Sequence, residues 1–129
     1  MTTFLFNMIF INMSVMINNQ TFPAEYLSEP QDLQKGMMDR ESLEGCMVFK
    51  MGLGHHSFHM KRCLIPLDIV FVNKNIISRI HSNCPPCDGE CKEKYTGIGD
   101  HVIEFPGGTA SNWKIGDRVY LGSKFNPVR

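Results

Sequence analysis

The most informative stretch for the fold is Leu67-Asp68-Ile69-Val70-Phe71-Val72. It is short, almost continuously apolar and rich in β-branched and aromatic residues, which is typical of a strand buried on both faces. Asn73-Lys74-Asn75 then interrupts the apolar run, and Ile76–His81 resumes it. The two runs and the polar break between them predict an antiparallel hairpin.

Further short runs of strand character occur on both sides of this hairpin. They are Met13–Ile17, Gln20–Leu27, Cys46–Phe49, Ser57–Met60, His101–Phe105 and Arg118–Leu121. Asn18-Asn19 is suited to a two-residue turn because Asn tolerates positive φ, and Gly52 and Gly54 indicate another turn. Residues 29–35 form the one credible helix, which Gly36 would end. The pattern predicts a mainly β fold, arranged as an antiparallel sandwich or barrel.

Charge is unevenly distributed along the chain, since no ionisable side chain precedes Glu25. We therefore expect three parts: an apolar N-terminal extension (residues 1–12), a single β-rich domain (residues 13–122) and a C-terminal tail (residues 123–129). The apolar start has no Lys or Arg before Lys35 and no Ala-x-Ala-like cleavage site, so it is a poor secretory signal. We expect a cytoplasmic protein, with export as the alternative if the N-terminus acts as an atypical signal.

Composition limits the classes of function. The 129 residues include 13 Lys+Arg and 13 Asp+Glu, and 43% are hydrophobic. This hydrophobic fraction is typical of a folded domain, and zero net charge argues against a nucleic-acid partner. No apolar stretch reaches the roughly 18 residues of a transmembrane segment. The partner is expected to be another protein or a small-molecule ligand.

A series of motifs follows Lys35 in a characteristic order. The motifs are Gly36-Met37-Met38-x-Arg40, Gly45-Cys46-Met47-Val48-Phe49, Met60-Lys61-x-x-Leu64-Ile65-Pro66-Leu67-Asp68, Val102-Ile103-Glu104 and Ile115-Gly116-Asp117. This order resembles the domain-of-unknown-function 192 (DUF192) family, a group of small β-rich domains of bacteria, archaea and some phages. The resemblance implies a single compact antiparallel β-sandwich, jelly-roll-like, with a short helix. It implies no established activity, and a phage source is one of the options.

A cluster of potential metal ligands lies in one loop, namely His81, Cys84, Cys87 and Cys91. One imidazole and three thiolates are a ligand set that Zn²⁺ accepts, although usual zinc modules pair two separated knuckles. Free thiols in a reducing compartment are a second option. The family resemblance favours a third, a disulfide between Cys87 and Cys91. No cofactor is expected, and zinc is the one alternative.

Arg40, Lys61 and Asp68 are polar residues within the resemblance-bearing motifs. Asp68 lies in an apolar strand, where a carboxyl group needs hydrogen bonds or an ion-pair partner. We expect backbone N–H groups or Arg40 to supply them, so that Asp68 stabilises the core. The functional alternative is that Arg40, Lys61 and Asp68 line a pocket for a small anion.

No catalytic residue is assigned from the sequence. Cys63 and His59 have the residue types of a nucleophile and its base, but their spacing does not guarantee that they approach each other. Nucleotide-binding, zinc-protease and serine-hydrolase motifs are absent. The favoured function is a non-enzymatic binding or accessory module. The alternatives are a thiol- or zinc-dependent protein centred on Cys84, Cys87 and Cys91, and an uncharacterised hydrolase or carbohydrate-active site in a sandwich cleft.

Overall fold

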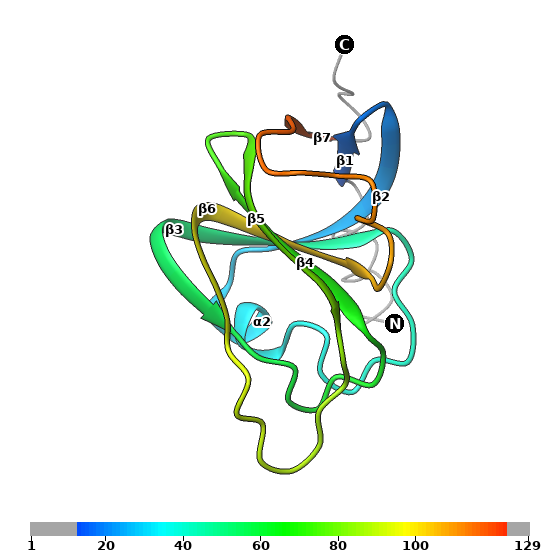
Figure 1. Ribbon diagram of the computed structural model, residues 1–129, viewed down its shortest axis with the longest axis vertical. Coiled ribbons are helices and arrows are strands. Elements are labelled where there is room, and N and C mark those ends of the chain that lie inside the picture. The colour runs from blue at the N-terminus through cyan, green and yellow to red at the C-terminus, as the bar shows by residue number, and fades with distance from the viewer. Residues whose placement is uncertain (1–12, 124–129) are drawn as a thin grey trace.

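The computed structural model describes residues 13–123, which form seven strands and one short helix (Figure 1). The predicted extension (residues 1–12) and most of the predicted tail (residues 124–129) lie outside the described residues. The elements are β1 (Met13–Ile17), β2 (Gln20–Leu27), α2 (Pro30–Lys35), β3 (Cys46–Phe58), β4 (Leu67–Asn73), β5 (Ile76–Cys84), β6 (Tyr95–Pro106) and β7 (Val119–Ser123). Within residues 13–123, no helix is long and apolar enough to cross a membrane.

Both predicted hairpins are present. β1 pairs with β2 through a turn at Asn18 and Asn19, whose φ angles are 49° and 67°. β4 pairs with β5 through a turn at Lys74 and Asn75, with φ angles of 50° and 65°. The predicted helix is also present, although it begins at Pro30. Local turn chemistry was therefore a sound guide to these elements.

The prediction of a purely antiparallel sheet was wrong. All seven strands lie in one sheet, in the order β5-β4-β6-β3-β2-β1-β7, and β2 runs parallel to β3. The parallel pair arises because α2 and residues 36–45 carry the chain back along β2 before β3 begins. The sheet is curled into a half-barrel, and backbone hydrogen bonds at Ile77 and Val119 join the start of β5 to the segment that leads into β7. The two packed sheets of a jelly-roll sandwich are not confirmed.

Alternate side chains of the central strands pack on opposite faces of this sheet. On one face, Val70 and Ile103 belong to a core that includes Trp113. On the other face, Phe71 and Val102 belong to a second core. Both faces are covered, which explains why β4 is an almost unbroken apolar run.

The second core is covered by the bent ends of β3 and β6. The prediction of a turn at Gly52 and Gly54 was wrong, because β3 continues through both glycines to Phe58 with an irregular register between Lys50 and Gly54. Figure 1 shows β3 and β6 turning sharply together. We call the paired residues 54–58 and 95–99 beyond this bend the arch.

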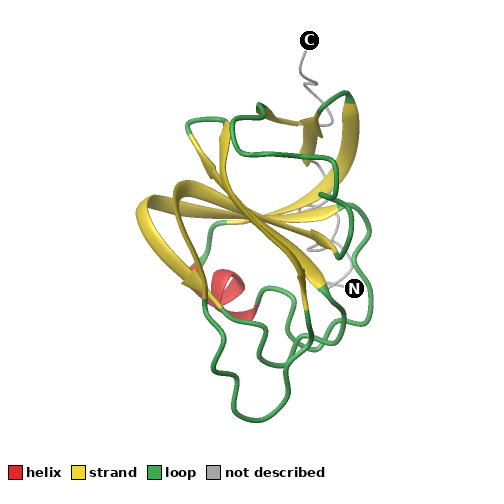
Figure 2. Ribbon diagram, viewed as in Figure 1, coloured by secondary structure: helices red, strands yellow, loops and turns green. Residues whose placement is uncertain are grey.

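The arch folds back over β4 and β5. Thr96 in the arch accepts a hydrogen bond from His81 Nε2 on β5 at 2.8 Å. Gly97 lies so close to β4 that a Cβ atom there would be 2.5 Å from Cγ of Phe71. Figure 2 shows the helix beside the bent strands, just above the long loops at the bottom of the view. The arch, α2 and these loops therefore enclose the second core.

Candidate functional site

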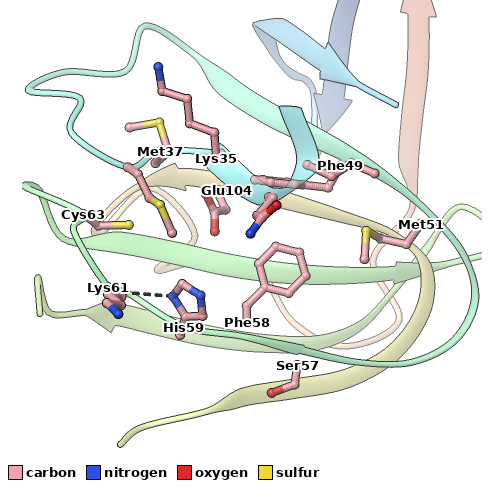
Figure 3. Close-up of a pocket in the computed structure, with 14 residues that line it drawn as sticks. Lys35, Met37, Phe49, Met51, Ser57, Phe58, His59, Lys61, Cys63 and Glu104 are labelled. Atoms are coloured by element: carbon pink, nitrogen blue, oxygen red, sulfur yellow. Dashed lines mark hydrogen bonds between the residues drawn. The ribbon is translucent and has the colours of Figure 1, made fainter. Parts of the chain in front are cut away.

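A pocket of about 210 Å³ lies between α2, the arch and residues 59–63 (Figure 3). Its lining is largely apolar and comes from segments far apart in the sequence. The lining residues that carry the argument are Met37, Phe49, Met51, Phe58, Cys63 and Glu104. Phe58 closes one side, because its ring packs edge-on against Phe49 at 5.0 Å and Phe71 at 6.0 Å between centroids.

Glu104 is the buried acidic residue in the lining of this pocket. It lies on β6 and pairs with Met47 on β3 and Ile69 on β4, so it is placed among the buried residues of the second core. Its side chain is 3% exposed. Figure 3 shows its carboxyl group between Met37 and Phe58.

The carboxyl group of Glu104 is incompletely hydrogen-bonded. Within the described part of the chain, Oε1 has no hydrogen-bond partner. Burial raises the pKa of Glu104 to about 8, because the apolar surroundings disfavour the charged form. At neutral pH the group is therefore mainly a neutral acid that can donate one hydrogen bond and accept others.

A second, shallower hollow of about 550 Å³ adjoins the pocket. We call it the vestibule, and it is lined by Gln31, Gln34, Lys35, Met38, Asp39, His59, Lys61 and Arg62. Arg62 is paired with Asp39. Lys35 and Lys61 are exposed, and neither has an ion-pair partner among residues 13–123. The vestibule is therefore positively charged.

The structure does not bring Arg40 and Asp68 to this pocket with Lys61. Arg40 makes two hydrogen bonds to Glu25 on β2, at 2.7 and 2.6 Å, and both side chains are partly buried. Asp68 is fully buried and accepts backbone hydrogen bonds from Asn83, Gly108 and Ala110 at 2.8, 3.1 and 2.7 Å. Its oxygens are thus occupied by the protein itself.

The four residues of the cysteine loop do not converge on one common site. Cys87 and Cys91 form a disulfide, whereas Cys84 is a free, buried thiol. His81 uses Nε2 to bond the Thr96 carbonyl. Over residues 13–123, no group of three or more His, Cys, Asp or Glu side chains is placed to hold a metal ion.

His59 and Cys63 both line the pocket, although their chemistry differs from that of a nucleophile and base. Burial, aided by the charges of Glu104 and Asp39, raises the pKa of the Cys63 thiol to about 12. Burial likewise raises the pKa of Cys84 to about 11, aided by the charges of Asp68 and Glu104. Both remain thiols near neutral pH, and the thiolate is the reactive form. Nδ1 of His59 accepts a hydrogen bond from the backbone N–H of Lys61 at 3.1 Å.

Sequence reasoning missed Glu104 as a site residue. The signal was the same one that singled out Asp68, a lone carboxyl group in an apolar strand, here Val102-Ile103-Glu104-Phe105. Since side chains alternate along a strand, Glu104 is expected on the same face as the buried Val102. This pattern predicts that the side chain of Glu104 is buried. It does not predict the pocket beside Glu104, because the pocket depends on the packing of α2 and the arch.

Two solved bacterial structures share this fold. One is a protein of unknown function from Novosphingobium aromaticivorans DSM 12444, 29% identical, with a TM-score of 0.72 over 84% of this chain and 82% of that one. The other is named a "putative transcription regulator" from Sinorhizobium meliloti 1021, 22% identical, with a TM-score of 0.73 over 84% of this chain and 90% of that one. The second likeness is one of fold alone.

No curated protein matches the chain. The family model for DUF192, described as "Uncharacterized ACR, COG1430", matches residues 3–121 and therefore nearly the whole sequence. The structural match to a protein of unknown function agrees with this description. The chain belongs to the DUF192 family.

Proposed function

We propose that this protein is a non-enzymatic module that binds one small organic ligand in the pocket beside Glu104. The observation that carries the proposal is the buried Oε1 of Glu104, which lacks a hydrogen-bond partner among residues 13–123 while lining a pocket. An unsatisfied buried polar group costs about 1–3 kcal/mol. A ligand that supplies the missing partner recovers part of this free energy.

The size and lining of the pocket suit a ligand with one ring. A cavity of about 150 Å³ lined by apolar side chains accommodates benzene. The pocket here is about 210 Å³ and is walled by Met37, Phe49 and Phe58. A six-membered ring with one or two substituents is therefore the size of ligand expected.

The protonated state of the Cys63 thiol supports ligand binding rather than covalent catalysis in this pocket. Cys63 is buried and its pKa is about 12, so it is a weak nucleophile near neutral pH. Glu104 is surrounded by apolar groups and has the character of a hydrogen-bonding contact for a ligand.

Phenol is a suitable first probe because it combines one ring with one hydroxyl group. The protein would carry ¹³C-labelled methionine methyl groups, and Met37 and Met51 would report on the pocket. We expect saturable shifts of these two signals at phenol concentrations on the order of 10 mM, since a ligand of this size binds weakly. Absence of such shifts would contradict the proposal.

A matched pair of variants tests the location. Gln34 is exposed and lines the pocket, so Gln34→Trp should obstruct it and abolish the shifts. Ser111 is equally exposed but lies outside the pocket lining, so Ser111→Trp should leave phenol binding unchanged. Equal binding by both variants would place phenol elsewhere.

A further inference from the structure

We infer that the pocket and the vestibule form one two-part site for an amphipathic organic anion. The ring of the ligand occupies the pocket, an inner hydroxyl group bonds Glu104, and an outer acidic group lies at Lys35 and Lys61. This inference rests on the proposed function and extends it to the chemical class of the ligand.

The two hollows are continuous. They share Gln34, Lys35, Met38, His59 and Lys61 in their linings. Figure 3 shows Lys35 and Lys61 on the same side of the pocket as Met37 and Cys63. A single ligand can therefore reach from the apolar interior to the vestibule.

The inner end of the site favours a neutral hydrogen-bonding group. Glu104 is 3% exposed, and burial is the sole cause of the rise in its pKa, so no neighbouring charge dominates its environment. An ammonium group would have to lose its hydration and pass two lysines to reach it, at a high electrostatic cost. A hydroxyl group can both donate to and accept from a carboxylic acid at little cost.

The outer end favours an anion. Lys35 and Lys61 are exposed and lack carboxylate partners among the described residues, while the vestibule's one acidic residue, Asp39, is paired with Arg62. An exposed ion pair contributes little free energy. The lysines therefore orient the ligand, and the ring and inner hydroxyl supply most of the affinity.

Three related probes separate the contributions. They are 3-(4-hydroxyphenyl)propionate, 3-phenylpropionate, which lacks the hydroxyl group, and 3-(4-hydroxyphenyl)propionamide, which lacks the charge. Their dissociation constants would be measured from the Met37 and Met51 methyl signals. We expect the first probe to bind roughly two- to tenfold more tightly than the second, which is the range of one net hydrogen bond. We expect the first probe to bind about threefold more tightly than the amide, and this difference in affinity should decline as salt is added.

Variants assign each contribution to its residues. Glu104→Met keeps a long side chain but removes the hydrogen bond, so 3-phenylpropionate should then bind at least as tightly as the hydroxylated acid. The double variant Lys35→Met/Lys61→Met should remove the preference for the acid over the amide. The double variant Lys50→Met/Lys114→Met, at exposed positions outside both linings, is the charge-matched control and should leave this preference intact.

The outcomes distinguish the inference from the proposed function. If all three probes bind equally and the variants do not alter their order, the two-part site is wrong and simple pocket binding stands. If none of the probes, nor phenol, shifts the Met37 and Met51 signals, both the inference and the proposed function are overturned. Should Glu104→Met perturb the fold, Glu104→Leu, which also lacks polar side-chain atoms, must still remove the preference for the hydroxylated over the unhydroxylated acid, and an unchanged ratio rejects the role of Glu104.

Discussion

Asp68 on β4 accepts a hydrogen bond from the backbone N–H of Ala110 at 2.7 Å, although 42 positions separate them in the chain. Further bonds from Asn83 and Gly108 converge on the same carboxyl group. Asp68 therefore ties the end of β5 and the turn after β6 to the central strand. The backbone donors explain how a fully buried carboxyl group is stabilised without Arg40.

Asp68→Asn should lower the free energy of unfolding by about 3 kcal/mol. The amide NH₂ would face a backbone N–H, leaving at least one buried donor unsatisfied. Urea unfolding followed by circular dichroism measures the change. Asp88→Asn is the control, because Asp88 is exposed and bonds the adjacent Gly89. An Asp68→Asn variant as stable as the control would show that the buried bonds do not stabilise the fold.

Gly97→Ala should destabilise the arch. The added Cβ would lie 2.5 Å from Cγ of Phe71, closer than nonbonded carbon atoms approach. We expect a loss of about 1–3 kcal/mol, typical of overpacking. Gly52→Ala, on the paired strand β3, would meet nothing within 4 Å and should be nearly neutral. Equal thermal midpoints for the two variants would contradict the close packing of the arch on β4.

Glu104 should make the protein less stable as pH rises from about 5 to 8. In this range the folded state holds a proton on Glu104, whose pKa is about 8, whereas the unfolded chain has lost it at the ordinary value of 4.5. Unfolding then releases a proton, so the free energy of unfolding falls by at most about 1.4 kcal/mol per pH unit. The stabilising contribution is complete below 4.5 and lost above the folded pKa. Urea unfolding at several pH values measures this slope.

Glu104→Gln isolates this effect from other titrating groups. Cys63 also lines the pocket, and burial keeps its thiol protonated over this range by raising its pKa to about 12. All other titratable groups are present in both proteins, so the difference between their slopes belongs to Glu104. Identical slopes would show that Glu104 is not held in its protonated form.

The cysteines should divide into two classes. In the native protein, iodoacetamide near neutral pH should react very slowly with Cys46, Cys63 and Cys84, because all three are buried and burial raises the pKa of each thiol. Mass spectrometry should count three modified cysteines after denaturation without reductant and five after reduction. Rapid native labelling of Cys63 would instead indicate an accessible thiolate.

Much of the secondary structure could be predicted from local patterns. Asn18-Asn19 and Asn73-Lys74-Asn75 combine turn residues with flanking apolar runs, and both hairpins form there. The bend of β3 could not be predicted in this way. Gly52 and Gly54 resemble a turn locally, but pairing with β6 keeps them within a continuous strand. Partners distant in sequence outweighed the local preference.

The sequence by itself determined the two hairpins, the short helix and the need of Asp68 for buried partners, because these depend on residue type and local turn chemistry. Burial of Glu104 was missed, although alternation along Val102-Ile103-Glu104-Phe105 carries its signal. The tertiary structure alone decided that β2 and β3 run parallel, that Arg40 pairs with Glu25, and that a pocket lies beside Glu104. Each of these features depends on segments far apart in the chain. The pocket, for example, joins α2, the arch and β6, which come together through packing of the whole chain, so no single segment carries a local pattern that predicts it.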